Sequence, residues 1–153
     1  MLFLCLIIFL INKALNKLTL KFELDFDFIL IAITSSLKDY RLCYEINKAM
    51  AVNFVRDEEL ALSFSKEKII QTFNRYVYIQ DDRDTEFYLL ANKGNEGFLI
   101  PEMNRVDYFL LIKNYIDKED LTRWLSHIKK IGEVLAAVEV EPKKLKSKEN
   151  LLF

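Results

Sequence analysis

The chain has few of the residues on which common enzyme chemistries depend: its 153 residues include three glycines, two prolines, two cysteines and one histidine. All three glycines lie at or after Gly94, so no Walker or dinucleotide-binding loop can form, and no cofactor is expected. The single histidine, His127, has no cysteine or second histidine at metal-ligand spacing and is expected on the solvent side of a helix. Zinc catalysis and a Ser/His/Asp triad are both disfavoured.

Charge and cysteine content limit the partners and the compartment. The formal net charge is -1 at pH 7, so no general field attracts the chain to nucleic acid, and no nucleic-acid partner is expected. Cys5 and Cys43 form no Cys-x-x-Cys motif, which favours a reducing, cytoplasmic compartment and a buried Cys43 thiol. Residues 142–153 are expected to form a solvated basic tail, because no aromatic residue is interleaved with Lys143, Lys144, Lys146 and Lys148.

Residues 1–17 form an apolar N-terminal extension. Its hydrophobic run, Met1 to Ile11, is well short of the roughly 20 residues that cross a bilayer as a helix. No basic residue follows Met1 directly and no small-x-small cleavage site precedes the domain, so a signal peptide fits poorly. Three interpretations remain: a start codon assigned too far upstream, a weak membrane-surface anchor, or a degenerate signal. A membrane partner is expected only if the extension is real.

Alternation of apolar and polar residues from Leu18 predicts a half-buried strand, which Ile29–Ile33 either extend or lead into a buried turn. Its polar face carries Glu23, Asp25 and Asp27. Three carboxylates can hold a metal ion, but this spacing is also ordinary on a solvent-facing strand.

The next elements predict the fold class. A capping-box pattern starts a helix at Ser36. Its buried stripe is expected to be Leu37, Tyr40, Cys43, either Ile46 or Asn47, and Met50. Alternating strands follow at 60–64, 72–79 and 87–91, the last two joined by a turn with Asp81, Asp82 and Asp84. A second helix should begin with Asp117 as its cap and end at Gly132, and a final strand should follow at 134–140. The buried stripe of this helix is expected to be Leu121, Trp124, Leu125, Ile128 and Ile131. We therefore expect one α+β domain, residues 18–141: a mostly antiparallel sheet of five to six strands with two main helices packed against it.

Residues Gly97–Lys113 place two apolar runs on either side of a polar elbow. Phe98–Ile100 is predicted as a short strand that Pro101 ends, because proline fixes φ and removes a backbone donor. Val106–Ile112 is apolar on both faces, which predicts a central strand. The elbow itself reads Ile100-Pro101-Glu102, three further residues, and then Val106-Asp107-Tyr108-Phe109.

This pattern resembles the signature of the IPExxxVDYF family, a small bacterial family of unknown function. The resemblance extends from about Leu18 to Phe153 and includes Leu37–Cys43 and Leu145–Leu151. It implies kinship but no activity, because the family has no assigned reaction, ligand or catalytic residue that could be transferred.

The polar residues of the elbow are the candidate site. Glu102 follows Pro101, while Asp107 and Tyr108 lie in an apolar run. A buried carboxylate needs several donors or a cation, which Lys38, Arg41, Arg105 or Lys113 could supply. In the structural interpretation, both acids hold the elbow to the first helix through ion pairs or backbone amides. In the functional interpretation, paired carboxylates bind a small cationic or hydroxylated ligand, or act as acid and base.

These observations favour a non-enzymatic cytoplasmic binding or adaptor module with a protein partner. The expected partner surface is an exposed sheet edge or an aromatic patch of Tyr76, Tyr78 and Tyr88. One alternative is a small ligand-binding protein or enzyme with its site at Glu102, Asp107 and Tyr108. Another is a protein attached to a membrane through residues 1–11.

Overall fold

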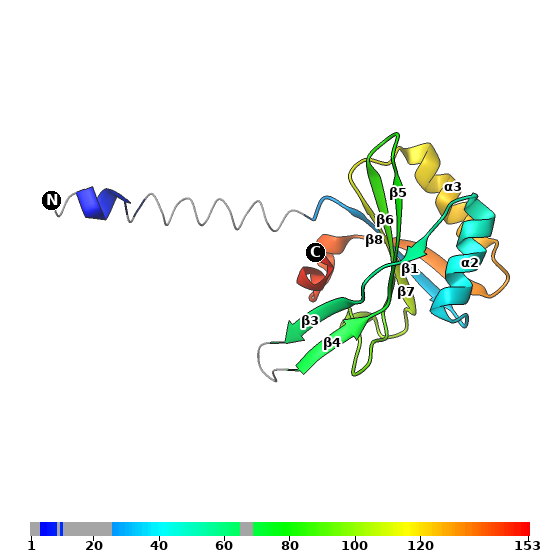
Figure 1. The fold of residues 1–153 in the computed structure, drawn as a ribbon, viewed down its shortest axis with the longest axis horizontal. Coiled ribbons are helices and arrows are strands. Elements are labelled where there is room, and N and C mark those ends of the chain that lie inside the picture. Colours follow the sequence, from blue (N-terminus) through cyan, green and yellow to red (C-terminus); the bar gives the residue numbers. More distant parts are fainter. Residues whose placement is uncertain (1–3, 9, 11–25, 65–68) are drawn as a thin grey trace.

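A six-stranded antiparallel sheet, in the order β2-β5-β6-β7-β1-β8, dominates the computed structural model (Figure 1). The structure describes residues 4–8, 10, 26–64 and 69–153. The strands of the sheet are β1 (Ile29–Ser35), β2 (Val55–Arg56), β5 (Arg75–Gln80), β6 (Thr85–Ala91), β7 (Tyr108–Lys113) and β8 (Val134–Val140). A separate two-stranded sheet pairs β3 (Leu60–Phe64) with β4 (Ile69–Phe73). The α+β class and the antiparallel sheet are thus confirmed.

The central strand is β7, which lies between β6 and β1 as its apolar sequence predicts. Its residues alternate between two cores: Leu110 and Ile112 pack on one face of the sheet, Phe109 and Leu111 on the other. Each of these four side chains is fully buried. A strand with apolar side chains on both faces is stable only when both faces are covered, and the remaining elements supply those two covers.

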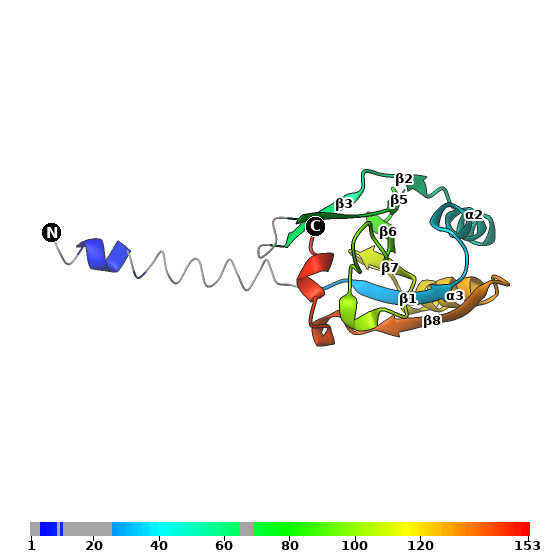
Figure 2. The same ribbon diagram turned by 90° about the horizontal axis from the view of Figure 1, so that it is seen from below.

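Two helices cover the first face, namely α2 (Asp39–Met50) and α3 (Lys118–Lys129) (Figures 1 and 2). The second face is covered by the C-terminal segment, which contains the 3-10 helices η2 (Pro142–Lys144) and η3 (Lys148–Leu151). Leu145 and Leu151 of this segment are buried against Leu30 and Phe109 of the sheet. Lys143, Lys144 and Lys146 are exposed as expected, but the expectation of a solvated tail is wrong for the segment as a whole, because its Leu145 and Leu151 are buried in the core.

The first predicted helix is correct in position but not in its start. α2 begins at Asp39, and its N-cap residue Lys38 makes no side-chain capping bond. The Tyr108 hydroxyl donates to the carbonyl oxygen of Leu37, and this bond holds the preceding turn in a non-helical conformation. Most of the predicted stripe packs against the core: Cys43 and Ile46 are buried, and Leu37 and Met50 are partly buried against them. Tyr40 is the exception, since it is 62% exposed while Leu42 is buried.

The second helix matches its prediction closely. The side chain of Asp117 caps α3 by accepting a hydrogen bond from the Asp120 amide at 2.8 Å. Trp124 and Ile128 are buried, and the other predicted stripe residues pack against the same core. The helix ends at Lys129, before Gly132, and no described glycine has a positive φ. The prediction that Gly132 stops the helix is wrong.

Two predicted strands differ from the observed ones. The run 72–79 is broken at Asn74, because Phe73 ends β4 in the small sheet and Arg75 begins β5 in the large one. Of the strand predicted from Leu18 to Phe28, residues 18–25, which include Glu23 and Asp25, are outside the described residues. Residues 26–28 are not in a strand, and β1 starts at Ile29.

Candidate functional site

The elbow is built around one buried asparagine, Asn92, which has no exposed surface. Its Nδ2 donates to the carbonyl oxygens of Met103 at 2.9 Å and Val106 at 2.7 Å, and its Oδ1 accepts from the Ile100 amide at 2.9 Å. The segment it folds is not the predicted strand: Phe98 forms only a single bridge with Lys93. Asn92 therefore fixes the shape of the elbow, because a buried backbone group left without a partner is costly.

The two acids of the elbow bind two different segments. Both oxygens of Glu102 accept from Ser147, one from the amide at 2.7 Å and one from the hydroxyl at 2.8 Å. Burial alone raises the pKa of Glu102, but these hydrogen bonds outweigh it, so the pKa lies below its ordinary value. Asp107 Oδ2 accepts from the Ser35 amide at 2.8 Å, at the end of β1. Glu102 thus fastens the C-terminal segment, and Asp107 joins β7 to the turn before α2.

Tyr108 is buried beneath that turn, with 8% of its surface exposed. Its hydroxyl donates to the Leu37 carbonyl oxygen at 2.5 Å. Burial, followed by the negative charges of Asp39 and Asp107, raises the pKa of Tyr108 to about 12. The phenol therefore remains protonated at neutral pH, which its role as a hydrogen-bond donor requires.

Arg41 lies outside this cluster. Its guanidinium pairs with Glu45 at 3.2 Å, the i,i+4 pair that the helix spacing predicts, and lies 5.2 Å from the centre of the Tyr44 ring. Of the five candidate residues, only Lys38, Asp107 and Tyr108 come together. Glu102 and Arg41 point to other partners.

These three residues line a polar cleft of about 590 Å³, which we call the α2 cleft. It lies where the turn before α2 meets the end of β6 and the start of β7. Its other lining residues include Asp39, Asn74 and Lys93. The sequence pattern did not single them out, because each lies in a turn or at an element boundary, where polar residues are ordinary.

Asp39 is held rigidly in the α2 cleft. Its Oδ2 accepts from Asn74 Nδ2 at 2.7 Å and from the Tyr76 hydroxyl at 3.1 Å. Burial and the charge of Asp39 raise the pKa of Tyr76 to about 12. The α2 cleft thus presents two fixed carboxylates, those of Asp39 and Asp107, and two ammonium groups, those of Lys38 and Lys93, which suits the binding of charged groups.

The predicted tyrosine patch does not exist. Tyr76 is buried, and Tyr78 packs against Phe54 and Phe87 in the core beneath the helices. Tyr88 belongs to the opposite core, where its hydroxyl donates to Glu86 at 2.9 Å. The aromatic rings stabilise two separate cores and offer no common surface to a partner.

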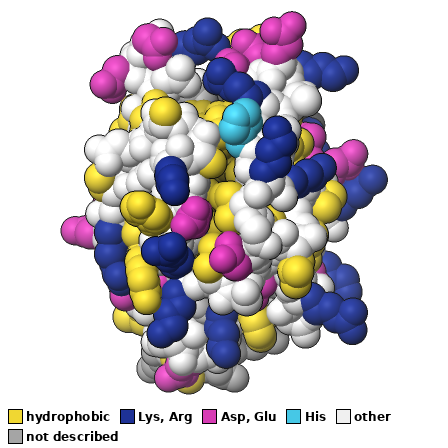
Figure 3. Space-filling model, turned by 90° about the vertical axis from the view of Figure 1, so that its right-hand side faces the viewer, with side chains coloured by type: hydrophobic (Ala, Val, Ile, Leu, Met, Phe, Trp, Pro, Cys, Tyr) yellow, Lys and Arg dark blue, Asp and Glu magenta, His cyan; other side chains and the backbone are white. Residues whose placement is uncertain are grey.

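The single histidine lies on the side of the molecule formed by α2 and α3 (Figure 3). His127 is half-buried and lines a pocket of about 360 Å³ with Glu45, Lys48 and Lys130. Its Nδ1 lies 2.8 Å from the Arg123 carbonyl oxygen. Because a carbonyl oxygen only accepts, Nδ1 carries the proton, and this bond directs the ring along its own helix.

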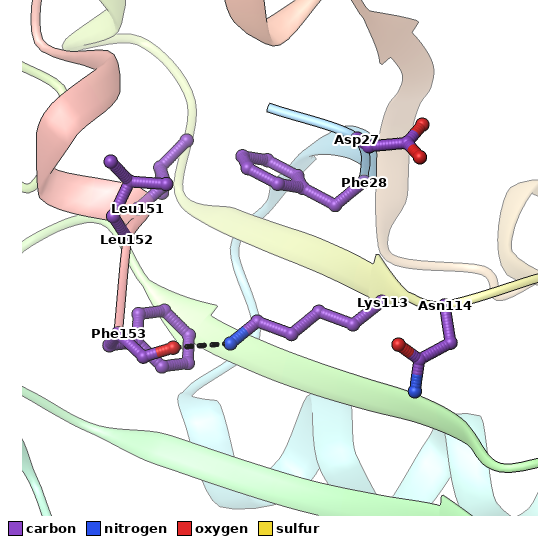
Figure 4. Close-up of a pocket in the computed structure, with 7 residues that line it drawn as sticks. All are labelled: Asp27, Phe28, Lys113, Asn114, Leu151, Leu152 and Phe153. Carbon is purple, nitrogen blue, oxygen red and sulfur yellow. Dashed lines mark hydrogen bonds between the residues drawn. The ribbon is translucent and has the colours of Figure 1, made fainter. Parts of the chain in front are cut away.

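A further pocket of about 310 Å³ lies beside the C-terminal segment (Figure 4). Lys113 reaches across it and donates to the Phe153 carbonyl oxygen, with its ammonium 4.2 Å from the centre of the Phe153 ring. Burial lowers the pKa of Lys113. Lys113 thus fastens the last described residue to β7, and it is not a partner for Asp107.

Within the described ranges, no group of three His, Cys, Asp or Glu side chains is placed to hold a metal ion. Asp81, Asp82 and Asp84 are exposed in the turn between β5 and β6. Residues 4–8 and 10 are helical, and every helix in the described part of the chain is too short or too polar to traverse a bilayer.

Fold and site together define an α+β protein with an antiparallel sheet and a polar cleft at one end of it. Comparison with protein-family models, curated proteins and solved structures gives no match. The resemblance to the IPExxxVDYF family therefore remains a prediction from the residues of the elbow.

Proposed function

We propose that the protein is a non-enzymatic binding or adaptor module whose partner adds a strand to the edge of the sheet at β8. The observation that carries this proposal is the exposure of that edge. β8 pairs with β1 on one side and has no strand partner on the other within the described part of the chain. Two of its apolar side chains face solvent: Leu135 is 80% exposed and Val138 is 58% exposed.

Natural proteins usually shield an edge strand of this length with charges or proline. β8 has the sequence Val-Leu-Ala-Ala-Val-Glu-Val, in which Glu139 is the only charged residue. A register shift opposite Leu135 disturbs the start of the strand, but pairing is regular from Ala136 to Val140. Such an edge favours recognition of an extended peptide through backbone hydrogen bonds.

The surroundings of β8 define the partner's chemistry. A pocket of about 350 Å³, lined by Lys129 and residues 134–138, lies along the strand and can take an apolar side chain. Lys129 forms no ion pair with any described residue. We therefore infer an extended segment with alternate apolar side chains, an acidic residue near Lys129 and a basic residue near Glu139.

Selection from a displayed random-peptide library tests this proposal. We expect peptides of the stated pattern to be enriched, and their binding to slow hydrogen exchange of the β8 amides. Val138→Lys should weaken binding at least tenfold, or about 1.4 kcal/mol. The matched control is Ile70→Lys in β4, where the side chain is 61% exposed but lies on the other sheet; it should bind as the wild type does.

Two results would overturn the proposal. One is a peptide set that binds the wild type and the Val138→Lys variant equally well. The other is a dimer in sedimentation equilibrium that Val138→Lys dissociates, because a second copy of the chain would then cover β8.

We place this module in the cytoplasm and within the IPExxxVDYF family as further proposals. The first is supported by Cys43, a buried thiol that contacts the Phe54 carbonyl oxygen at 3.8 Å. Burial and the nearby charge of Asp39 raise the pKa of Cys43 to about 11, which makes it a poor nucleophile. Membership of the IPExxxVDYF family is supported by the match of residues Ile100 to Phe109 to the family's signature.

A further inference from the structure

The α2 cleft has binding capacity that the fold leaves unused. Each of its two carboxylates has one oxygen engaged: Asp39 Oδ2 by Asn74 and Tyr76, and Asp107 Oδ2 by the Ser35 amide. The second oxygen of each accepts no hydrogen bond from a described residue. The structural bonds fix the direction of both carboxylates, so that the remaining oxygens are preorganised acceptors.

The same cleft carries two cations without structural duties. Lys38 and Lys93 line it and are exposed, and neither forms an ion pair with the described part of the chain. By contrast, Lys113 donates to the Phe153 carbonyl oxygen and Arg41 pairs with Glu45, so both cations already have partners. Charges that serve no internal contact are available to a ligand.

The mixture of charges restricts the ligand. An inorganic phosphate or another simple anion would meet the carboxylates of Asp39 and Asp107, and a simple cation would meet the two lysines. A ligand with an ammonium group and a carboxylate satisfies both pairs. The volume of about 590 Å³ lies within the range of small-molecule sites.

We propose that the α2 cleft binds a small zwitterion of the amino acid or dipeptide class. Its ammonium group binds the free oxygens of Asp39 and Asp107, and its carboxylate binds Lys38 and Lys93. Asn74 donates to Asp39 and accepts from the Arg56 guanidinium at 3.0 Å, so its role is to hold the Asp39 carboxylate in place for the ligand. This site is separate from β8 and does not depend on the adaptor proposal.

The test is a titration of the isotope-labelled full chain with the standard amino acids and glycylglycine, followed by amide NMR shifts. We expect at least one compound to bind with a Kd of about 1 mM or tighter and to shift the amides of Ser36–Asp39 and Lys93. Its N-acetylated and its carboxamide derivatives should each bind at least tenfold more weakly, because each lacks one charge.

Two variants keep the test independent of folding. Asp107→Asn removes the charge but retains an oxygen that can accept from the Ser35 amide, and it should weaken binding about tenfold. Lys93→Gln should do the same, whereas the matched control Lys143→Gln, at an exposed lysine outside the cleft, should have no effect. The proposal is overturned if no compound shifts the cleft amides, or if phosphate or the single-charge derivatives bind as well as the zwitterion.

Discussion

Replacing Asn92 with alanine should be among the most destabilising single changes in the protein. The variant loses three hydrogen bonds, one buried and two half-buried. The Ile100 amide and the Val106 carbonyl oxygen lose the Asn92 side chain as their partner, whereas the Met103 carbonyl oxygen still accepts from the Val106 amide at 3.0 Å. At about 1 kcal/mol net for each bond, with more for each buried group left unpaired, the expected loss is about 3 to 5 kcal/mol. Domains of this size have about 5 to 15 kcal/mol in total, so the variant should be marginally folded.

Urea unfolding followed by tryptophan fluorescence measures this loss, since Trp124 is buried between α3 and the sheet. Asn150→Ala is the matched control: it removes one half-buried bond, from Asn150 Nδ2 to the Leu99 carbonyl oxygen at 2.8 Å, and should cost about 1 kcal/mol. If Asn92→Ala lost no more than the control, Asn92 would not organise the elbow.

Two further predictions concern glycine and acid. Gly94→Ala should lower the free energy of unfolding by about 1 to 3 kcal/mol, because the new Cβ would lie 2.7 Å from the Phe73 ring. The control Gly132→Ala, whose new Cβ would have nothing within 4 Å, should change the free energy of unfolding by less than about 0.5 kcal/mol. Equal effects of the two variants in chemical denaturation would contradict this reasoning. The lowered pKa of Glu102 contributes stability above the ordinary pKa of 4.5, and that contribution disappears as the pH falls through the lower folded value. Acid titration should therefore destabilise the wild type more than Glu102→Gln, and parallel pH profiles would show that the bonds to Ser147 stabilise nothing.

The regular elements were predictable because their side chains repeat with the period of the structure. The α3 stripe and the β7 run each contain enough apolar residues to identify helix or strand and its buried face. The start of α2 was not predictable, because it is set by a bond between Tyr108 and Leu37, which are 71 positions apart. A local capping pattern at Ser36 carries no information about that contact.

The candidate site was predictable only in part. The chemistry of Asp107 and Tyr108 stood out because polar groups are unusual next to a central strand. Their neighbours Asp39 and Lys93 did not, since three-dimensional proximity brings them together from separate turns. Asn92 did not stand out either, because asparagine is ordinary near turns and its burial depends on the elbow folding over it. Likewise the lysine-rich C-terminal segment conceals Leu145 and Leu151, whose spacing follows no helical or strand period.

The position of β1 in the sheet has a consequence for how the protein folds. Its two neighbours, β7 and β8, begin 79 and 105 residues after Ile29. A nascent chain emerging from the ribosome therefore holds β1 without either hydrogen-bonding neighbour until most of the sequence has been made. Such high contact order predicts slow folding and a long-lived exposed strand, which makes β1 the natural segment for a chaperone to protect during synthesis.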